Sequence, residues 1–417
     1  MKLRITAKSL AFYTICILFL LGSTHFLYLI NLKSIFTATN VLLSFFSILI
    51  FILSLVVLDG EKYYKGRFSG VIFFFFLILV ISSINSYYTL GYGLKDLGVY
   101  FLAYIPLALY YPFVNILRKK QYYNKFIRLS EIFWDILAIL FILQYFICLK
   151  GGQYFLKISN LVAHGYFMRI YGIFDGFLRA FILVIAHRII YKGIRNSSFD
   201  VISFVLFLLS IILIDQSRYY LICVLLCVFI DYMYTNRKQM KFSRIIGLVI
   251  LSIGVLLIVR SNVNSINTSI SSDQNYSLAR IGGAKYYFNI FLNNIFWGIG
   301  PVVTPNEGTT AWSLVRGPFG IFHVSDVGIV GTMAMFGVPI VIFVICVFVK
   351  SLNLVKETTE SQRGQNISLL TMMFVSWISI SSYLDTSRVL TLLFTLVFME
   401  VTSLAREDKD SVLLERE

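Results

Sequence analysis

The chain has little charge for its length. Asp, Glu, Lys and Arg together make up 14% of the 417 residues, whereas 58% of the residues are apolar. In soluble domains about a quarter of all residues are charged, so this composition excludes an ordinary water-soluble protein. A membrane-spanning helix takes about 20 apolar residues, which allows the chain roughly a dozen spans with short connections. We therefore expect a single polytopic membrane domain over residues 1–417, with no second, soluble domain.

Residue types that bind metals are also scarce. The five cysteines all lie within apolar runs, where a cysteine packs as a small apolar side chain, and the chain has only four histidines. Cys223 and Cys227 are four residues apart, but the sequence offers neither of them a histidine or carboxylate suited to a metal site. The sequence therefore predicts no disulfide framework, no metal and no cofactor.

Long apolar runs are abundant. Twelve runs are long enough, or nearly so, to cross a bilayer. They lie at residues 9–30, 38–58, 68–84, 97–117, 129–149, 173–191, 201–214, 219–234, 245–259, 327–349, 367–382 and 389–404. The sequence thus predicts an all-α integral membrane protein with about 12 transmembrane helices, although the two runs that flank Asp215 are short for spans.

Positive charge is distributed unevenly between the two sides of this layout. The net charge of +15 would suggest a nucleic-acid partner in a soluble protein, but in a membrane protein it reports orientation. With twelve spans, the seven segments on the side of the termini hold 24 of the 36 Lys and Arg residues. The positive-inside rule then places both termini in the cytoplasm, so the excess positive charge reports orientation and we expect no nucleic-acid partner.

Two of the segments predicted to face outward are long. One covers residues 150–172, and the other covers residues 260–325 between spans 9 and 10. Loops of this length usually have a function or are disordered. The second one contains glycines, prolines and the aromatic residues Trp297 and Trp312. We therefore expect a large extracytoplasmic loop that forms a partly ordered cap with short or re-entrant helices.

Arginine is the main basic residue outside the predicted cytoplasmic segments. A single such arginine could simply reach the lipid headgroups or pair with an aspartate. Together, however, the arginines predict a cluster of guanidinium groups suited to phosphate oxygens, such as those of a lipid-linked pyrophosphate. Two of them follow an aspartate in a tight turn next to a span. The full set is Arg169, Arg179, Arg218, Arg260, Arg280, Arg316 and Arg388, with Arg218 and Arg388 in the turns.

The large loop ends with a histidine and an aspartate next to the following span. His323 is the only histidine of this loop, and Asp326 comes three residues later. Imidazole exchanges a proton near neutral pH, which makes His323 a candidate general base and Asp326 its candidate partner. The alternative is an interfacial histidine without a chemical role, followed by an acid that the start of a helix favours.

Several short motifs occur in a fixed order along the second half of the chain. They are Ser217-Arg218 at the start of a span, Arg280 before the Gly-x-Gly of Gly298 and Gly300, and His323, Ser325, Asp326, Gly328, Gly331 and Gly337 in a His-x-Ser-Asp-x-Gly-x-x-Gly pattern with a further glycine. This order, on a polytopic chain with a late outer loop, resembles the O-antigen polymerases and the related O-antigen ligases of bacterial envelopes. The layout covers nearly the whole chain.

The resemblance implies a metal-independent membrane glycosyltransferase that joins undecaprenyl-pyrophosphate-linked oligosaccharide repeat units on the outer face of the cytoplasmic (inner) membrane. It implies that Arg218 and Arg280 hold the pyrophosphate and that His323 assists transfer. Arg169, Arg316, Arg388 and Asp326 complete the predicted site. In the ligases the histidine is usually followed by Asn, Ser or Gln, whereas Val324 follows His323 here, which favours a polymerase. Expected partners are the lipid-linked oligosaccharide, membrane lipid, a flippase and a chain-length regulator.

Two other functions fit a chain of this layout. A flippase or exporter of the lipid-linked unit would also use arginines, but it should show charges in mid-span and two matching halves. A glycosyltransferase that uses polyprenyl-phosphate sugars resembles the chain in span number, but such enzymes rely on acids in the first outer loop, and residues 31–37 contain none. The sequence does not distinguish a polymer destined for lipopolysaccharide, capsule or exopolysaccharide.

Overall fold

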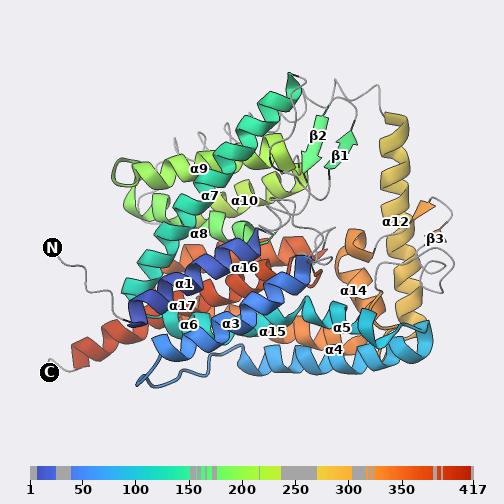
Figure 1. Ribbon diagram of the computed structural model, residues 1–417, viewed down its shortest axis with the longest axis horizontal. Coiled ribbons are helices and arrows are strands. Elements are labelled where there is room, and N and C mark those ends of the chain that lie inside the picture. Colours follow the sequence, from blue (N-terminus) through green and yellow to red (C-terminus); the bar gives the residue numbers. More distant parts are fainter. Residues whose placement is uncertain are drawn as a thin grey trace.

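The structure is a computed structural model in which nearly all of the described chain is helical (Figure 1). The strands of the described part form two short two-stranded hairpins. This arrangement confirms the predicted helical class. The residues that the structure describes are 7–24, 39–150, 156, 161–164, 167–170, 176–215, 217–235, 270–302, 316–317, 320–321, 324–378, 383–386 and 388–414.

The first half of the chain is a series of helices followed by one hairpin. In order, the elements are α1 (Ala7–Ser23), α3 (Thr39–Val57), α4 (Ser69–Leu90), α5 (Leu94–Leu102), the 3-10 helix η1 (Ile105–Leu109), α6 (Tyr110–Leu117), α7 (Lys120–Leu149), β1 (Leu161–His164) and β2 (Phe167–Ile170).

The second half continues with helices and contains the other hairpin. In order, the elements are α8 (Phe177–Lys192), η2 (Ile194–Asn196), α9 (Ser198–Ser210), the π-helix η3 (Ile211–Asp215), α10 (Arg218–Thr235), α12 (Ile270–Asn293), β3 (Arg316–Gly317), β4 (Gly320–Ile321), η5 (Val324–Val327), α14 (Gly328–Phe336), α15 (Val338–Glu357), α16 (Glu360–Ile378) and α17 (Val389–Leu414).

Helices long and apolar enough to cross a membrane are present, as a membrane-embedded protein requires. Among the described residues there are five of them: Ser69–Leu90, Leu94–Leu117, Lys120–Leu149, Ser198–Asp215 and Val338–Glu357. Shorter apolar helices cover Ala7–Ser23, Leu42–Val57, Tyr219–Thr235 and Val389–Leu404. The count of twelve spans stays a prediction, and the predicted span at 245–259 lies outside the described residues.

Within the described residues, three predicted spans are not continuous α-helices, and one of them, 201–214, passes from α9 into the π-helix η3. The run 97–117 contains η1, which has Pro106 in its first turn, where proline's missing N–H interrupts the helical hydrogen bonding. The run 327–349 is divided at Gly337, whose φ of 68° lies in the left-handed region, and Pro339 then stands in the first turn of α15. The prediction of one helix over 327–349 was therefore wrong, because glycine followed by proline ends one helix and starts the next.

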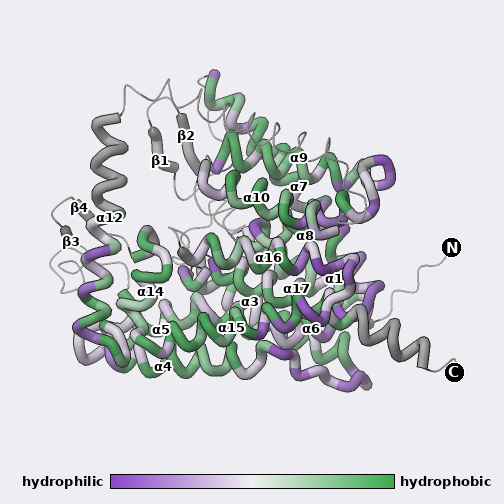
Figure 2. Tube along the Cα trace, turned by 180° about the vertical axis from the view of Figure 1, so that it is seen from behind, coloured by the Kyte–Doolittle hydropathy of each residue, from purple (hydrophilic) through white to green (hydrophobic). Residues whose placement is uncertain are grey.

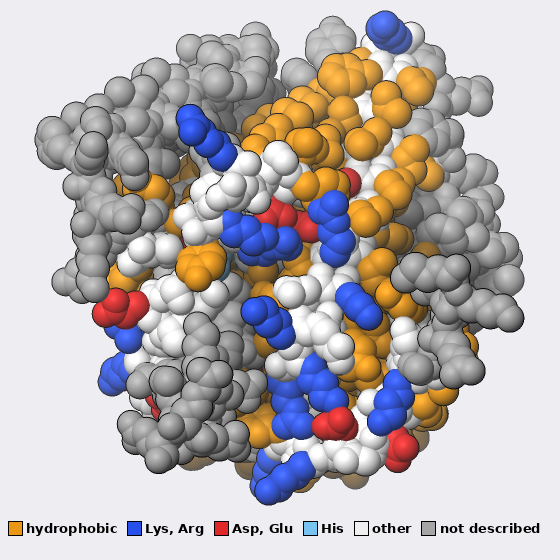
Figure 3. All heavy atoms as spheres, turned by 90° about the vertical axis from the view of Figure 1, so that its left-hand side faces the viewer, with side chains coloured by type: hydrophobic (Ala, Val, Ile, Leu, Met, Phe, Trp, Pro, Cys, Tyr) orange, Lys and Arg blue, Asp and Glu red, His pale blue; other side chains and the backbone are white. Residues whose placement is uncertain are grey.

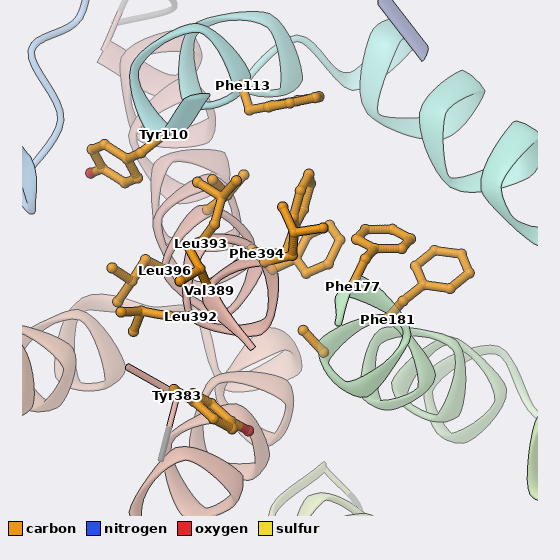
Figure 4. Close-up of a cluster of buried hydrophobic side chains, with 14 of the residues drawn as sticks. Tyr110, Phe113, Phe177, Phe181, Tyr383, Val389, Leu392, Leu393, Phe394 and Leu396 are labelled. Carbon is orange, nitrogen blue, oxygen red and sulfur yellow. The ribbon is translucent and has the colours of Figure 1, made fainter. Parts of the chain in front are cut away.

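Aromatic side chains fill the centre of the bundle around α17. Figure 4 shows Phe394 of α17 beside Phe177 of α8, and the two ring centroids lie 4.6 Å apart with the rings almost perpendicular. Phe394 also stacks on Phe126 of α7 at 5.7 Å and meets Phe113 of α6 edge-on at 5.0 Å. Such pairs add attraction beyond simple burial. They fix the start of α8 against the first turns of α17.

Helix ends that the sequence predicts to be on one side do meet in the structure. Three contacts of basic side chains join segments of this predicted side: Lys8 to the carbonyl oxygen of Asp59, Arg118 to the carbonyl oxygen of Lys62, and Arg67 to the carboxylate of Glu357. Figure 3 shows many Lys and Arg side chains on this face, which we call the basic face. In Figure 2 much of the hydrophilic colour lies on the same side, where α1 begins and α3 connects to α4.

Candidate functional site

Three helices begin close together at the ends remote from the basic face. The hydroxyl of Thr391, in the first turn of α17, donates to the carbonyl oxygen of Gly176 just before α8 at 2.8 Å. The guanidinium of Arg179, in the first turn of α8, lies 4.6 Å from the ring centroid of Tyr220 near the start of α10. The first turns of α8, α10 and α17 therefore meet, and the N-terminus of each helix carries positive partial charge.

Each of these three helix starts carries an arginine. Arg179 is the third residue of α8, Arg218 is the first residue of α10, and Arg388 directly precedes α17. We call this group of helix starts the arginine end. Helix N-termini bind anions through their free N–H groups, and guanidinium groups bind phosphate oxygens in pairs. The combination is suited to an anion with several oxygens.

Arg179 is more deeply buried than Arg388. Its residue surface is only 3% exposed and that of Tyr220 is 2% exposed. A guanidinium stacked on an aromatic ring gains cation–π attraction, which is stronger when water is excluded. Burial raises the pKa of the nearby Tyr383 hydroxyl, while the Ser376 side chain and the positive charge of Arg179 oppose this rise. A buried arginine in a membrane protein marks a functional site by default.

Arg388 lies in a turn that is fixed on both sides. Its Nη1 atom lies 3.0 Å from Oδ2 of Asp385, so the expected pairing of this arginine with an aspartate is present. The hydroxyl of Tyr104, in the connection between α5 and η1, donates to the carbonyl oxygen of Leu384 at 2.7 Å. Together these contacts hold the guanidinium next to the start of α17.

The hairpin of β1 and β2 brings Arg169 toward the arginine end. In this hairpin Arg169 is paired with Val162. Strand β2 contacts η3, the segment that ends at Asp215 just before α10. The structure describes the backbone of Arg169 and of Arg218, and the backbone brings these two predicted site residues into one region.

The other predicted site residues form a second group around α12. Arg280 lies in α12, Arg316 lies in β3, and Asp326 lies in η5. Helix α12 contacts β3, η5 and α14, so the three residues lie on elements that contact one another. Figure 1 shows α12 at the right-hand side, running across the direction of α4 and α15. The predicted site is thus divided between two groups, and His323 lies outside the described residues.

The Gly-x-Gly motif belongs to a segment that fastens α12 to the bundle. We call residues 294–302 the glycine hook. The N–H groups of Ile299 and Gly300 donate to the carbonyl oxygens of Ala334 and Met335 at the end of α14, at 3.0 and 2.9 Å. These carbonyls have no partner within their own helix, because helix C-termini leave their last carbonyl groups unpaired.

The other edge of the glycine hook is bound to α4. Asn85 donates from its amide to the carbonyl oxygen of Gly298 at 2.7 Å, and Ser86 donates to the carbonyl oxygen of Pro301 at 2.9 Å. Gly300 has a φ of 85°, and a Cβ atom there would collide with Ser86. The motif therefore has a structural role in this fold, because only glycine allows this close approach.

A pair of tyrosines connects the two groups. The hydroxyl groups of Tyr100 and Tyr104 lie 3.0 Å apart, and that of Tyr100 lies 3.8 Å from the sulfur atom of Met335 in α14. Tyr104 in turn binds Leu384 in the turn before Arg388. Sequence reasoning missed both tyrosines. Their i, i+4 spacing in an apolar run was the only available signal.

Arg179 was recognised in the sequence as an outer arginine but was left out of the predicted site. The signal that it shares with Arg218 and Arg388 is its position, since all three lie at the start of a span that runs toward the predicted cytoplasmic side. Within the described ranges, no group of three or more His, Cys, Asp or Glu side chains could hold a metal ion. Metal independence stays a prediction.

No protein-family model matches the chain, no curated protein matches it, and no solved structure matches it. The likeness to the O-antigen polymerases therefore rests on the motifs and the layout alone.

Proposed function

We propose that the protein is a membrane glycosyltransferase that joins undecaprenyl-pyrophosphate-linked oligosaccharide repeat units at the outer face of the cytoplasmic membrane. The observation that carries this proposal is the convergence of three helix N-termini, each with an arginine: Arg179, Arg218 and Arg388. A pyrophosphate has several oxygens and more than one negative charge. Three arginines at three helix starts match that ligand better than they match a single carboxylate.

The proposed reaction requires one base and a place for the leaving group. The hydroxyl oxygen of the acceptor sugar forms a bond with the anomeric carbon of the donor unit, and the bond from that carbon to the pyrophosphate breaks. His323 takes the proton of the hydroxyl, and Asp326 orients or supports the histidine. The arginines stabilise the negative charge that develops on the leaving pyrophosphate, without a metal. Arg280 and Arg316, on elements of the same group as Asp326, are assigned to the second lipid-linked unit.

The buried charges of the bundle favour a fixed site over transport. Described ionisable side chains such as Glu131, Asp231 and Glu400 lie toward the basic face and have partners there: Glu131 with Arg188, Asp231 with His187, and Glu400 with two tyrosines. A carrier for a charged lipid unit needs polar groups that serve the unit on its way across the membrane. This distribution supports a polymerase over the flippase alternative.

The test of this proposal is polymer formation by purified protein in nanodiscs. The substrate is the lipid-linked repeat unit, and a chelator is present so that metal dependence is tested as well. We expect a ladder of oligosaccharides from the wild type. Arg179→Gln should abolish the ladder, whereas Arg195→Gln, in the exposed η2 turn of the basic face, should leave it unchanged. Translocation of the unit without polymer would instead identify a flippase.

A further inference from the structure

An apolar cavity of about 360 Å³ lies between α14, α15 and α16. Seven side chains line it, and all of them are apolar. Ile345 and Phe348 of α15 form one wall, while Phe374 and Trp377 of α16 form the other. An occupant of this cavity finds no hydrogen-bonding wall, so it must itself be apolar over this length.

The cavity opens on a surface that faces the bilayer. Ile345 is 56% exposed and Phe374 is 48% exposed, whereas Trp377 is only 3% exposed. The two exposed side chains therefore form the mouth and Trp377 forms the floor. Helix α15 is one of the helices apolar enough to cross a membrane, so the mouth is open to lipid. A hydrocarbon chain can enter from the side without crossing the headgroup layer.

Helix α16, which carries the floor of the cavity, also contacts the arginine end through its other faces. Trp377 lies two residues after Val375, whose carbonyl oxygen accepts a 2.7 Å hydrogen bond from the Tyr219 hydroxyl. Tyr219 directly follows Arg218. Ser376, next to Trp377 in the sequence, lies beside the Tyr383 hydroxyl, which is also near Arg179. One side of α16 thus borders the cavity while its neighbouring residues contact the segments that carry the arginines.

We propose that this cavity holds the polyisoprenoid chain of the lipid-linked unit whose pyrophosphate binds at the arginine end. The identity of this ligand rests on the proposed function. An anionic head and a long hydrocarbon tail on the same molecule fit a cationic site and an apolar cavity that border the same helix, α16. A chain that moves from lipid into the cavity gains close packing and no hydrophobic free energy, so shape decides what binds.

The test is photolabelling in nanodiscs with two probes that are used separately. One probe is undecaprenyl pyrophosphate with a diazirine in an isoprene unit near the pyrophosphate, and the other is phosphatidylglycerol with a diazirine in an acyl chain. Labelled peptides are mapped by mass spectrometry. We expect the first probe to label residues 338–378 in the wild type. Ile345→Trp, which fills the mouth, should reduce this labelling at least fivefold, while Ile342→Trp, at an exposed position of α15 that does not line the cavity, should not.

The outcomes separate this inference from the proposed function. Polymer formation by the wild type together with isoprenoid labelling elsewhere in the chain overturns the cavity assignment and leaves the polymerase in place. Isoprenoid labelling of the cavity without any polymer supports the cavity and overturns the polymerase. Equal labelling of the cavity by the phospholipid probe, unaffected by excess unlabelled undecaprenyl pyrophosphate, overturns the isoprenoid assignment and identifies a site for membrane lipid.

Discussion

The basic face and the arginine end are both rich in basic side chains, but these side chains make different contacts at the two ends. At the basic face, Arg188 lies 3.2 Å from Oε1 of Glu131 and 3.0 Å from Oδ1 of Asp200, so one guanidinium joins α7, α8 and α9. At the arginine end, Arg179 stacks on an aromatic ring, and three helix N-termini add further positive charge. The first arrangement connects three helices through ion pairs, whereas the second adds the positive charge of helix N-termini to its arginines, of which Arg388 pairs with Asp385 within its own turn.

Glu400 shows that an acidic residue of the basic face also connects elements of the protein. Its carboxylate accepts hydrogen bonds from the Tyr64 hydroxyl at 2.8 Å, from the Tyr110 hydroxyl at 3.0 Å and from the backbone N–H of Arg67 at 3.1 Å. Burial and then the negative charge of Glu400 raise the pKa of Tyr64 to about 12. The connection between α3 and α4 is thereby attached to α17. These partners are supplied by the chain itself, which is typical of a structural role.

The largest effect is expected at the predicted base. His323→Ala and His323→Gln should each slow polymer formation by about 100-fold to 10,000-fold, the range that loss of a general base produces. Binding of the lipid-linked unit should change little, because the histidine acts on the acceptor hydroxyl. Rates are measured with purified protein at matched concentration. Wild-type rates in His323→Gln would leave catalysis to positioning and to the arginines.

A smaller but still large effect is expected at Arg179. Arg179→Ala should reduce polymer formation by about 100-fold or more, as loss of one fixed donor to a developing anion does. Arg179→Lys should rescue poorly, because an ammonium group lacks the planar fork and stacks less well on Tyr220. The measurement is the initial rate with the lipid-linked unit. If Arg179→Lys restored the full rate, a single positive charge would suffice, and the proposed bidentate binding of phosphate by Arg179 would be wrong.

At the basic face, mutation should affect stability and leave the chemistry intact. Glu400→Gln removes the charged acceptor of three hydrogen bonds, one buried and two partly buried, and we expect it to lower the free energy of unfolding by about 1 to 3 kcal/mol. Thermal unfolding in detergent should show a lower midpoint, while the rate per folded molecule stays at the wild-type value. A loss of rate without a loss of stability would place Glu400 in the reaction and would weaken the contrast between the two ends.

The smallest effect is expected for an exposed pair of the basic face. Lys119 Nζ lies 2.6 Å from Oε1 of Glu61, and the hydrogen bond and positive charge of Lys119 lower the pKa of this carboxyl group. Its charged form is therefore favoured in the folded state, so any stabilisation is present at neutral pH and is lost as the pH falls through the lowered pKa. Because the pair is exposed, Glu61→Gln should leave both the melting midpoint at pH 7 and the polymer rate unchanged. A clear drop in the melting midpoint or in the polymer rate would show that the Lys119–Glu61 pair contributes more than an exposed ion pair is expected to contribute.

The sequence predicted the helical class and the grouping of the basic segments, because apolar run length and Lys/Arg placement follow directly from the bilayer. It did not predict the division at Gly337, although Gly337 followed by Pro339 is a known signal for a helix stop and start. It also did not predict that Gly298 and Gly300 bind the end of α14 and α4, since contacts between distant segments leave no local pattern. For the candidate site, the sequence allowed us to predict which residue types take part. It did not allow us to predict which of these residues lie on elements that contact one another. The helix starts that carry Arg388 and Arg179 meet because aromatic packing joins α8 to α17, which no spacing in the sequence reveals.

The measurement that tests the central claim most directly is the binding of undecaprenyl pyrophosphate to the purified protein in nanodiscs, compared with undecaprenyl monophosphate. The account predicts that the pyrophosphate binds at least about tenfold more tightly, because its additional oxygens and charge engage more than one guanidinium. Arg179→Gln and Arg388→Gln should each remove most of this preference, and Arg195→Gln should retain it. Equal affinity for the two lipids in the wild type, or an unchanged preference in both arginine-end variants, would contradict the assignment of the arginine end as the pyrophosphate site.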